Sequence, residues 1–215
     1  MREKDTAASL HISHYVERTH VLGPFSRSAL WVQGCCFSCE GCMAREMHDG
    51  EGTRVDCGTL ASALSAVAGT EGITISGGEP FLQAGALAVL LHKIRAQRDY
   101  GVIIYTGFLY EDLLNRSQKE SGISRLLDLT DLLIDGPYEA ELDDGKPYRG
   151  SSNQRFVRLS ERYANVFEAY YNDAQGRKME INFSRAGTTF VGVPSKSGLD
   201  AWRRIRSTRG CLRHG

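Results

Sequence analysis

The sequence predicts an α/β domain built around a parallel sheet that is buried on both faces. Short continuous apolar runs recur along the chain without the alternation of a half-exposed strand, a pattern typical of strands covered on both sides. Helical patterns separate these runs, and the later runs lie about 30 residues apart, the usual length of a βαβ unit. We therefore expect strands and helices to alternate along the chain, with the helices packed on the sheet.

Four apolar runs are the expected strands. They occupy residues 29–32, 73–75, 102–105 and 132–134. The expected helices lie at 60–67, 82–98 and 121–129. The second helix is the clearest, because its apolar residues recur at spacings of one, three and four. Segment 10–28, before the first strand, has a mixed pattern with a turn at Gly23 and Pro24.

The pattern changes after residue 154. Residues 156–159 fit a fifth strand, and the stretches 179–183 and 189–193 flank a turn, which predicts a β-hairpin. The arginine-rich tail from Trp202 indicates a solvated helix. We therefore divide the chain into a domain of residues 1–160 and an extension, residues 161–215, that carries the hairpin and the basic tail.

A cysteine-rich loop follows the first expected strand. Cys35, Cys39 and Cys42 have the spacing Cys-x3-Cys-x2-Cys. Thiolates this close in sequence suit three corners of a cuboidal iron–sulfur cluster. Since a [4Fe–4S] cluster needs four ligands, one iron would stay open, which suggests catalysis. The alternative is a zinc loop of Cys36, Cys39, Cys42 and a histidine, although that spacing is tight for tetrahedral zinc and no second Cys-x2-Cys pair follows.

Three more loops follow the other expected strands. They are Ser76-Gly77-Gly78-Glu79-Pro80, Thr106-Gly107 and Asp135-Gly136-Pro137-Tyr138. Because the carboxyl ends of parallel strands share one edge of a sheet, all four loops should converge there. Gly77 and Gly78 have no Cβ, so the backbone could approach a ligand closely. An ordinary turn is the simpler interpretation of each of these three loops taken alone.

Composition and charge exclude several classes of protein. The chain has 215 residues and a formal net charge of zero, so it has no general electrostatic footprint for nucleic acid or an anionic membrane. No apolar run approaches the roughly 20 residues that span a bilayer, and because no apolar stretch follows the first residues we expect that they are not a secretory signal. Six cysteines without such a signal indicate the reducing cytoplasm.

The remaining cysteines and histidines have simple expected roles. We expect Cys36, Cys57 and Cys211 to be free thiols. The simplest role for each is that of a small apolar side chain buried in the protein. We expect His11 and His14, in a polar N-terminal segment, to be exposed rather than to bind a ligand. The sequence has no Walker phosphate loop, no Ser-His-Asp order and no His-Glu-x-x-His zinc motif.

Residues 12–157 resemble radical S-adenosylmethionine enzymes, and within them the activating proteins of anaerobic ribonucleotide reductase. The motifs that carry the resemblance are 21–24, 31–35, the cysteine loop, 76–80, 105–108, 133–137 and 149–154. The cysteine loop is specific for the superfamily, and Arg-Gly-Ser-Ser-Asn-Gln at 149–154 is more specific for the activase-like branch. Phe25 departs from the pattern, which usually has a glycine there, and the chain continues well past Gln154, where compact activases nearly stop.

The resemblance implies a fold and a set of cofactor-binding residues. The fold is a partial (βα) barrel of parallel strands, here with a small C-terminal β-hairpin extension. Cys35, Cys39 and Cys42 would hold a [4Fe–4S] cluster, whose open iron would bind the amino and carboxylate groups of S-adenosyl-L-methionine. Further contacts to that cofactor are implied for Gly41, Met43, Ser76, Gly77, Gly78, Glu79, Tyr105, Thr106 and Gly107. Among these, Gly41 and Met43 would touch the adenosyl part, and 76–79 the methionyl ammonium.

The same resemblance implies radical chemistry on a large partner. One electron from a donor such as flavodoxin or ferredoxin would split S-adenosylmethionine into methionine and a 5′-deoxyadenosyl radical, with no acid–base pair required. The partner would be a glycyl radical enzyme such as an anaerobic ribonucleotide reductase, and no nucleic acid or membrane would be involved. Two alternatives stay open: a radical enzyme that modifies a peptide or small molecule, and a non-enzymatic metal-binding module.

Overall fold

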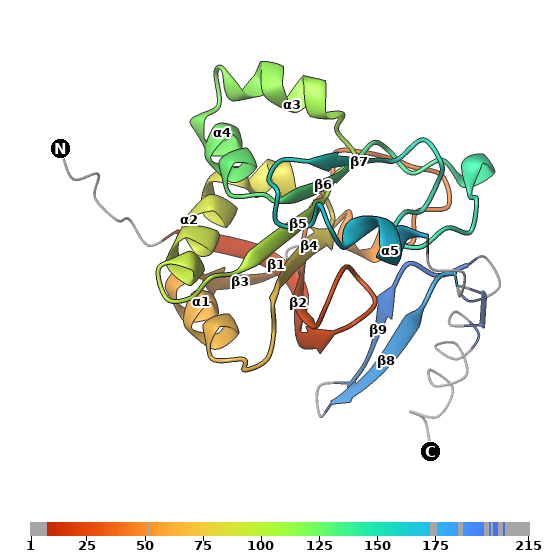
Figure 1. The fold of residues 1–215 in the computed structure, drawn as a ribbon, viewed down its shortest axis with the longest axis horizontal. Coiled ribbons are helices and arrows are strands. Elements are labelled where there is room, and N and C mark those ends of the chain that lie inside the picture. Colours follow the sequence, from red (N-terminus) through yellow and green to blue (C-terminus); the bar gives the residue numbers. More distant parts are fainter. Residues whose placement is uncertain are drawn as a thin grey trace.

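The computed structural model describes residues 8–50, 52–172, 176–184, 187–195, 198, 200, 201 and 204. Seven strands form one mixed sheet in the order β3-β1-β2-β4-β5-β6-β7, and β8 and β9 form a separate two-stranded sheet. Figure 1 shows the helices α1, α2 and α4 along one side of the large sheet and the hairpin on the opposite side. The predicted α/β class with a mostly parallel central sheet and a small C-terminal hairpin is confirmed.

The four predicted parallel strands form the centre of the sheet. They are β2 (Arg27–Val32), β4 (Gly72–Gly77), β5 (Gly101–Tyr105) and β6 (Leu132–Asp135). Each pairs in parallel with the next, and every residue of β2 and β6 is buried. Continuous apolar runs therefore predicted these strands correctly, because neither face of this part of the sheet has to be polar.

Antiparallel strands complete the sheet at both ends. β1 (Ser9–Thr19) and β3 (Thr53–Asp56) extend it beyond β2, and β7 (Arg155–Arg158) extends it beyond β6. The predicted partial barrel is not confirmed, since the sheet runs from β3 to β7 with antiparallel pairs at each end. The sequence did not predict β1 as a strand, because irregularities in its register interrupt the period of two.

Helices cover the face of the sheet that bears the largest apolar core. They are α1 (Cys57–Ser65), α2 (Ala84–Arg95), α3 (Tyr110–Ser117) and α4 (Ser121–Asp128). Short 3₁₀ turns occupy Arg45–Met47 (η1), Pro80–Gln83 (η2) and Ala140–Leu142 (η3). The helix that we predicted over 82–98 thus begins as a 3₁₀ turn at Pro80, and α3 was not predicted. No described helix is long and apolar enough to cross a membrane.

Residues beyond the predicted boundary at 160 contact the main sheet. Tyr163 is buried, and its hydroxyl accepts a hydrogen bond from Arg27 Nη1 at 2.8 Å. After α5 (Phe167–Tyr171), the hairpin of β8 (Met179–Ser184) and β9 (Gly187–Gly192) was predicted correctly. The division at residue 160 stays a prediction. Cys211 and the basic tail from Trp202, apart from Arg204, lie outside the described residues.

Candidate functional site

A pocket of about 620 Å³ lies at the carboxyl edge of the parallel strands. Each of the four strands contributes lining residues from its end or from the loop that follows it, including Cys35 after β2, Ser76 in β4, Tyr105 in β5 and Gly136 after β6. The predicted convergence of four loops is therefore confirmed. The volume falls within the range of roughly 300 to 1,000 Å³ that is usual for ligand sites.

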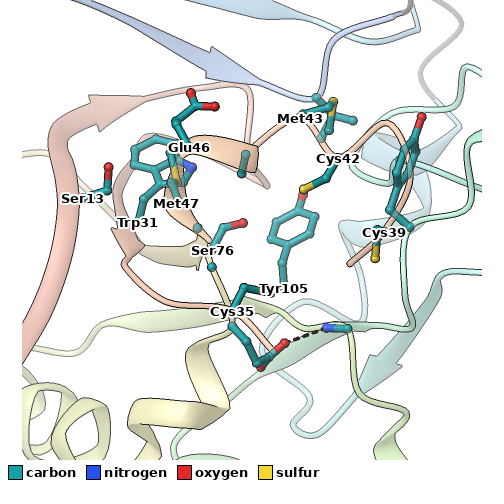
Figure 2. Close-up of a pocket in the computed structure, with 18 of the residues that line it drawn as sticks. Ser13, Trp31, Cys35, Cys39, Cys42, Met43, Glu46, Met47, Ser76 and Tyr105 are labelled. Atoms are coloured by element: carbon teal, nitrogen blue, oxygen red, sulfur yellow. Dashed lines mark hydrogen bonds between the residues drawn. The ribbon is translucent and has the colours of Figure 1, made fainter. Parts of the chain in front are cut away.

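Three of the four cysteines in the loop line this pocket. Cys35, Cys39 and Cys42 are half-buried free thiols, whereas Cys36 is exposed and lies outside the lining. Burial raises the pKa of Cys35 to about 11 and also raises the pKa of Cys42. Figure 2 shows all three thiols around one cavity. The structure thus brings together the set given by the x3-x2 spacing, and not the set that includes Cys36.

The base of the cysteine loop is tied closed by backbone hydrogen bonds. Gly34 N donates to Met47 O at 2.8 Å, and Cys35 N donates to His48 O at 3.3 Å. His48 Nε2 also lies 3.3 Å from Cys42 Sγ. Among the residues that the structure describes, no three His, Cys, Asp or Glu side chains are grouped so that they could hold a single metal ion.

The glycine loop after β4 packs directly on the start of the cysteine loop. Gly78 N donates to Val32 O, and Glu79 N donates to Gly34 O, both at 2.8 Å. A Cβ on Gly78 would lie 2.0 Å from Gly34 O, and one on Gly77 would lie 2.4 Å from Val32 O. We expected these glycines to make room for a ligand; the structure shows that they also make room for the cysteine loop.

Glu79 connects the glycine loop to the loop after β5. Its side chain is buried and accepts hydrogen bonds from Phe81 N (2.9 Å), Thr106 Oγ1 (2.8 Å) and Gly107 N (2.9 Å). Burial raises the pKa of Glu79 to about 7. A carboxylate can accept about four hydrogen bonds. Three are used within the chain, so Glu79 braces the two loops and keeps about one acceptor position for a ligand.

Tyr105 points into the middle of the pocket. Its hydroxyl is shielded from solvent and has no hydrogen-bond partner in the described part of the chain. Figure 2 shows the ring directed from the sheet toward Cys42. Of the twelve site residues that the sequence suggested, Gly41 alone is not part of the lining; a Cβ on it would lie 3.6 Å from the ring of Tyr138, which does line the pocket.

We expected the His14 side chain to be exposed, and that prediction was wrong. His14 is half-buried, lines the pocket and stacks on Trp31, with ring centroids 4.5 Å apart and an interplanar angle of 16°. Its position could have been inferred only from the strand pattern of β1, which the register irregularities obscure. His11, on the same strand, is exposed as predicted. Sequence reasoning also missed that residues 188–190 and 192–194 of the hairpin region line the pocket.

Comparison with known proteins identifies the domain that carries this site. Residues 21–157 match the model of a protein family described as a 4Fe-4S single cluster domain. The chain belongs to that family. The matched stretch contains the cysteine loop and the loops after β4, β5 and β6, so the residues predicted for the cluster lie within the 4Fe-4S single cluster domain.

Named relatives of this 4Fe-4S single cluster protein agree with the resemblance seen in the sequence. A protein of Enterobacteria phage T4 is 33% identical over 142 residues, which is 63% of this chain and 85% of the relative. A protein of Vibrio cholerae is 29% identical over 149 residues, 65% of this chain and 92% of the relative. A protein of Escherichia coli K12 is 29% identical over 143 residues, which is 62% of this chain and 89% of the relative. Each is named an anaerobic ribonucleoside-triphosphate reductase-activating protein.

Replacing Glu79 with glutamine should destabilise the fold. The amide offers one acceptor oxygen and one NH₂ group, so it cannot accept from both Phe81 N and Gly107 N in the present arrangement. Leaving a buried donor unpaired costs about 1–3 kcal/mol. Denaturant unfolding of the cluster-free Glu79→Gln protein would measure this loss.

The matched control for that substitution is Glu120→Gln. Glu120 is exposed and pairs with Arg116 four residues earlier, an arrangement worth about 0.5 kcal/mol or less. An equal loss of stability in the two variants would show that the brace at Glu79 has no special role.

Proposed function

We propose that this protein is a radical S-adenosylmethionine enzyme that installs a glycyl radical on an anaerobic ribonucleotide reductase. The proposal is supported by one observation above all: Cys35, Cys39 and Cys42 share a single pocket with the loops after β4 and β5. The names of the relatives in the 4Fe-4S single cluster family support the choice of partner.

The thiols of Cys35, Cys39 and Cys42 would hold the [4Fe–4S] cluster. The site fits such a group in its donors, because sulfur ligands are usual for these clusters and the three thiols are free of disulfides. The fit extends to the backbone, since the loop is closed at its base and backed by the glycine loop. Three ligands from the chain would leave one iron for the cofactor.

S-adenosylmethionine would bind beside the cluster, against the ends of β4 and β5. Its contacts would come from Gly41, Met43, Ser76, Gly77, Gly78, Glu79, Tyr105, Thr106 and Gly107, of which all but Gly41 line the pocket. A bound cluster would supply the electron for reductive cleavage of this cofactor to methionine and a 5′-deoxyadenosyl radical. The chain's own role is to orient the cofactor and to exclude water from the pocket.

The electron would come from a small carrier such as flavodoxin or ferredoxin in the cytoplasm. Residues 1–160 would form the radical domain and 161–215 an extension of it. A second candidate, modification of a peptide or small molecule, is favoured by the hairpin, which lines the pocket although it lies beyond the family match.

Single Cys→Ala substitutions should separate the cluster ligands from the other thiol of the loop. Cys35→Ala, Cys39→Ala and Cys42→Ala should each lose most of the bound iron and sulfide after anaerobic reconstitution, because each removes one of three thiolates. Cys36→Ala is the matched control and should keep both, since Cys36 is exposed outside the pocket. If Cys35→Ala kept its iron and Cys36→Ala lost it, the assignment would be reversed. If the wild-type protein contained one zinc per chain and no iron, the alternative of a non-enzymatic metal-binding module would be supported.

Tyr105→Phe should weaken S-adenosylmethionine binding by about two- to twelvefold, because it removes one buried hydroxyl and so about 0.5–1.5 kcal/mol of hydrogen bonding. Equilibrium binding to the reconstituted protein would measure the change, with iron content expected to be unaffected. Tyr15→Phe, at an exposed tyrosine, is the control. Unchanged affinity in Tyr105→Phe would place the cofactor elsewhere. Gly78→Val is a poor test of this binding, because its Cβ would first collide with Gly34.

The function itself is tested by electron paramagnetic resonance. Reduced enzyme and S-adenosylmethionine are mixed anaerobically with the anaerobic ribonucleotide reductase of the same genome, and a doublet glycyl signal on the large protein is expected. If that signal is absent while a peptide or metabolite stimulates 5′-deoxyadenosine formation, the second candidate function replaces the first.

A further inference from the structure

The pocket continues beyond the residues assigned to the cluster and to S-adenosylmethionine. We call this part the outer subsite; its lining residues are His14, Trp31, Glu46, Met47, Thr189 and Phe190. Figure 2 shows Trp31, Glu46 and Met47 grouped on the side of the cavity away from Cys39, with the blue hairpin running above. None of these six residues is among those assigned to the cluster or to S-adenosylmethionine, so this part of the pocket is a candidate site for a substrate.

The hairpin forms a fixed wall of the outer subsite. Glu180 on β8 accepts hydrogen bonds from Thr19 Oγ1 (2.7 Å) and His20 N (3.0 Å), at the turn between β1 and β2. On β9, Val191 is fully buried and packs in the same apolar cluster as Val21 and Trp31. These contacts hold the hairpin against the body of the protein on the side of β1 and β2.

A second anchor holds the opposite side of this wall. The Arg177 side chain is 4% exposed, forms an ion pair with Asp143 at 2.8 Å and donates to the carbonyl oxygens of Arg149 (2.8 Å) and Gly150 (2.9 Å). Those residues belong to the connection between β6 and β7. The hairpin therefore bridges from the β1–β2 turn to the β6–β7 connection and borders the pocket between them.

This wall lies outside the part of the chain that the family shares. The family match ends at residue 157, before the hairpin begins. The alignments cover 85% and 92% of the phage and Vibrio relatives but only 63% and 65% of this chain. The hairpin therefore adds a wall to a pocket whose cysteine loop and strand-end loops lie within the family match.

One polar group of the outer subsite is the imidazole of His14. His14 Nδ1 lies 3.1 Å from Ser13 Oγ, while Nε2 is shielded from solvent and has no hydrogen-bond partner among the described residues. Burial lowers the pKa of His14, although Glu46 acts in the opposite direction. Buried polar atoms nearly always have a partner. An uncharged amide would supply one, since neutral imidazole nitrogen can donate or accept according to its tautomer.

The charge of the lining disfavours anionic substrates. None of the described residues that line the pocket is lysine or arginine, and the carboxylic side chains among them are those of Glu46 and Glu79. Phosphate groups are usually bound by arginine, lysine or a metal. A nucleotide would therefore find no cationic side chain here, whereas a peptide backbone would find the aromatic platform of Trp31 and His14 and the unpaired Nε2 atom.

We propose that the outer subsite binds an extended, uncharged polypeptide segment of the partner, with a backbone amide hydrogen-bonded to His14 Nε2 and the hairpin as one wall of the subsite. The inference rests on the proposed function and specifies how its protein substrate is recognised. His14 is a binding residue in this scheme and takes no part in cofactor cleavage.

The test is peptide binding to the reconstituted protein with S-adenosylmethionine present and no reductant. Glycine-containing peptides tiled across the anaerobic ribonucleotide reductase of the same genome are titrated by calorimetry. His14→Phe keeps a ring against Trp31 but removes Nε2, so the affinity for the bound peptide should fall about tenfold. His14→Gln, which restores an amide near that position, should recover part of it. Thr189→Trp, which fills the subsite from the hairpin side, should also weaken binding, and His92→Phe, at an exposed histidine of α2, should not.

The outcomes separate this inference from the proposed function. S-adenosylmethionine affinity and 5′-deoxyadenosine formation by the reduced protein should be the same in wild type and in His92→Phe, whose substitution lies outside the pocket. No cleavage by wild type would defeat the proposed function. Cleavage without peptide binding, or peptide binding that His14→Phe leaves unchanged, would overturn the inference alone. The inference would also be overturned if a nucleoside triphosphate bound to the wild-type protein but not to His14→Phe.

Discussion

The site depends on a close approach between two backbones at the carboxyl ends of β2 and β4. Parallel pairing of Val32 with Gly77 brings the ends of the two strands into contact. The hydrogen bonds Gly78 N to Val32 O and Glu79 N to Gly34 O then continue the pairing into the loops. This continuation is sterically possible because Gly78 has no Cβ to meet Gly34 O. The first residue of the cysteine loop is thereby fixed to the sheet.

Glu79 links this contact between β2 and β4 to the end of a third strand, β5. Its backbone holds the cysteine loop, and its carboxylate holds Thr106 and Gly107 after β5. A Cβ on Gly107 would lie 2.6 Å from the ring of Phe37, so the loop after β5 also packs directly on the cysteine loop. Hydrogen bonds and packing within the chain therefore hold three strand ends together. Preorganisation of this kind reduces the cost of ordering the site when a cofactor arrives.

The sequence predicted the parts of this arrangement that depend on local pattern. Apolar runs located the four parallel strands, and the loops that follow them converge because parallel strands end at one edge. The parts it missed depend on contacts between distant segments. Glu180 meets Thr19 across 161 positions, and nothing in either local sequence reports that pairing. β1 escaped prediction because its register shifts break the period of two, and the position of His14 on the pocket was lost with it.

The apolar cluster beneath the hairpin joins the shared and the added parts of the site. Val191 and Val193 of the extension pack in one cluster with Trp31 of β2 and Met47 at the exit of the cysteine loop. Met43, next to Cys42, packs against the same cluster. The hairpin and the cysteine loop therefore cannot shift independently, because close-packed interiors transmit displacement rather than absorb it. A segment that enters the outer subsite contacts both at once, so the wall that selects the substrate also positions it relative to the pocket of the three cysteines.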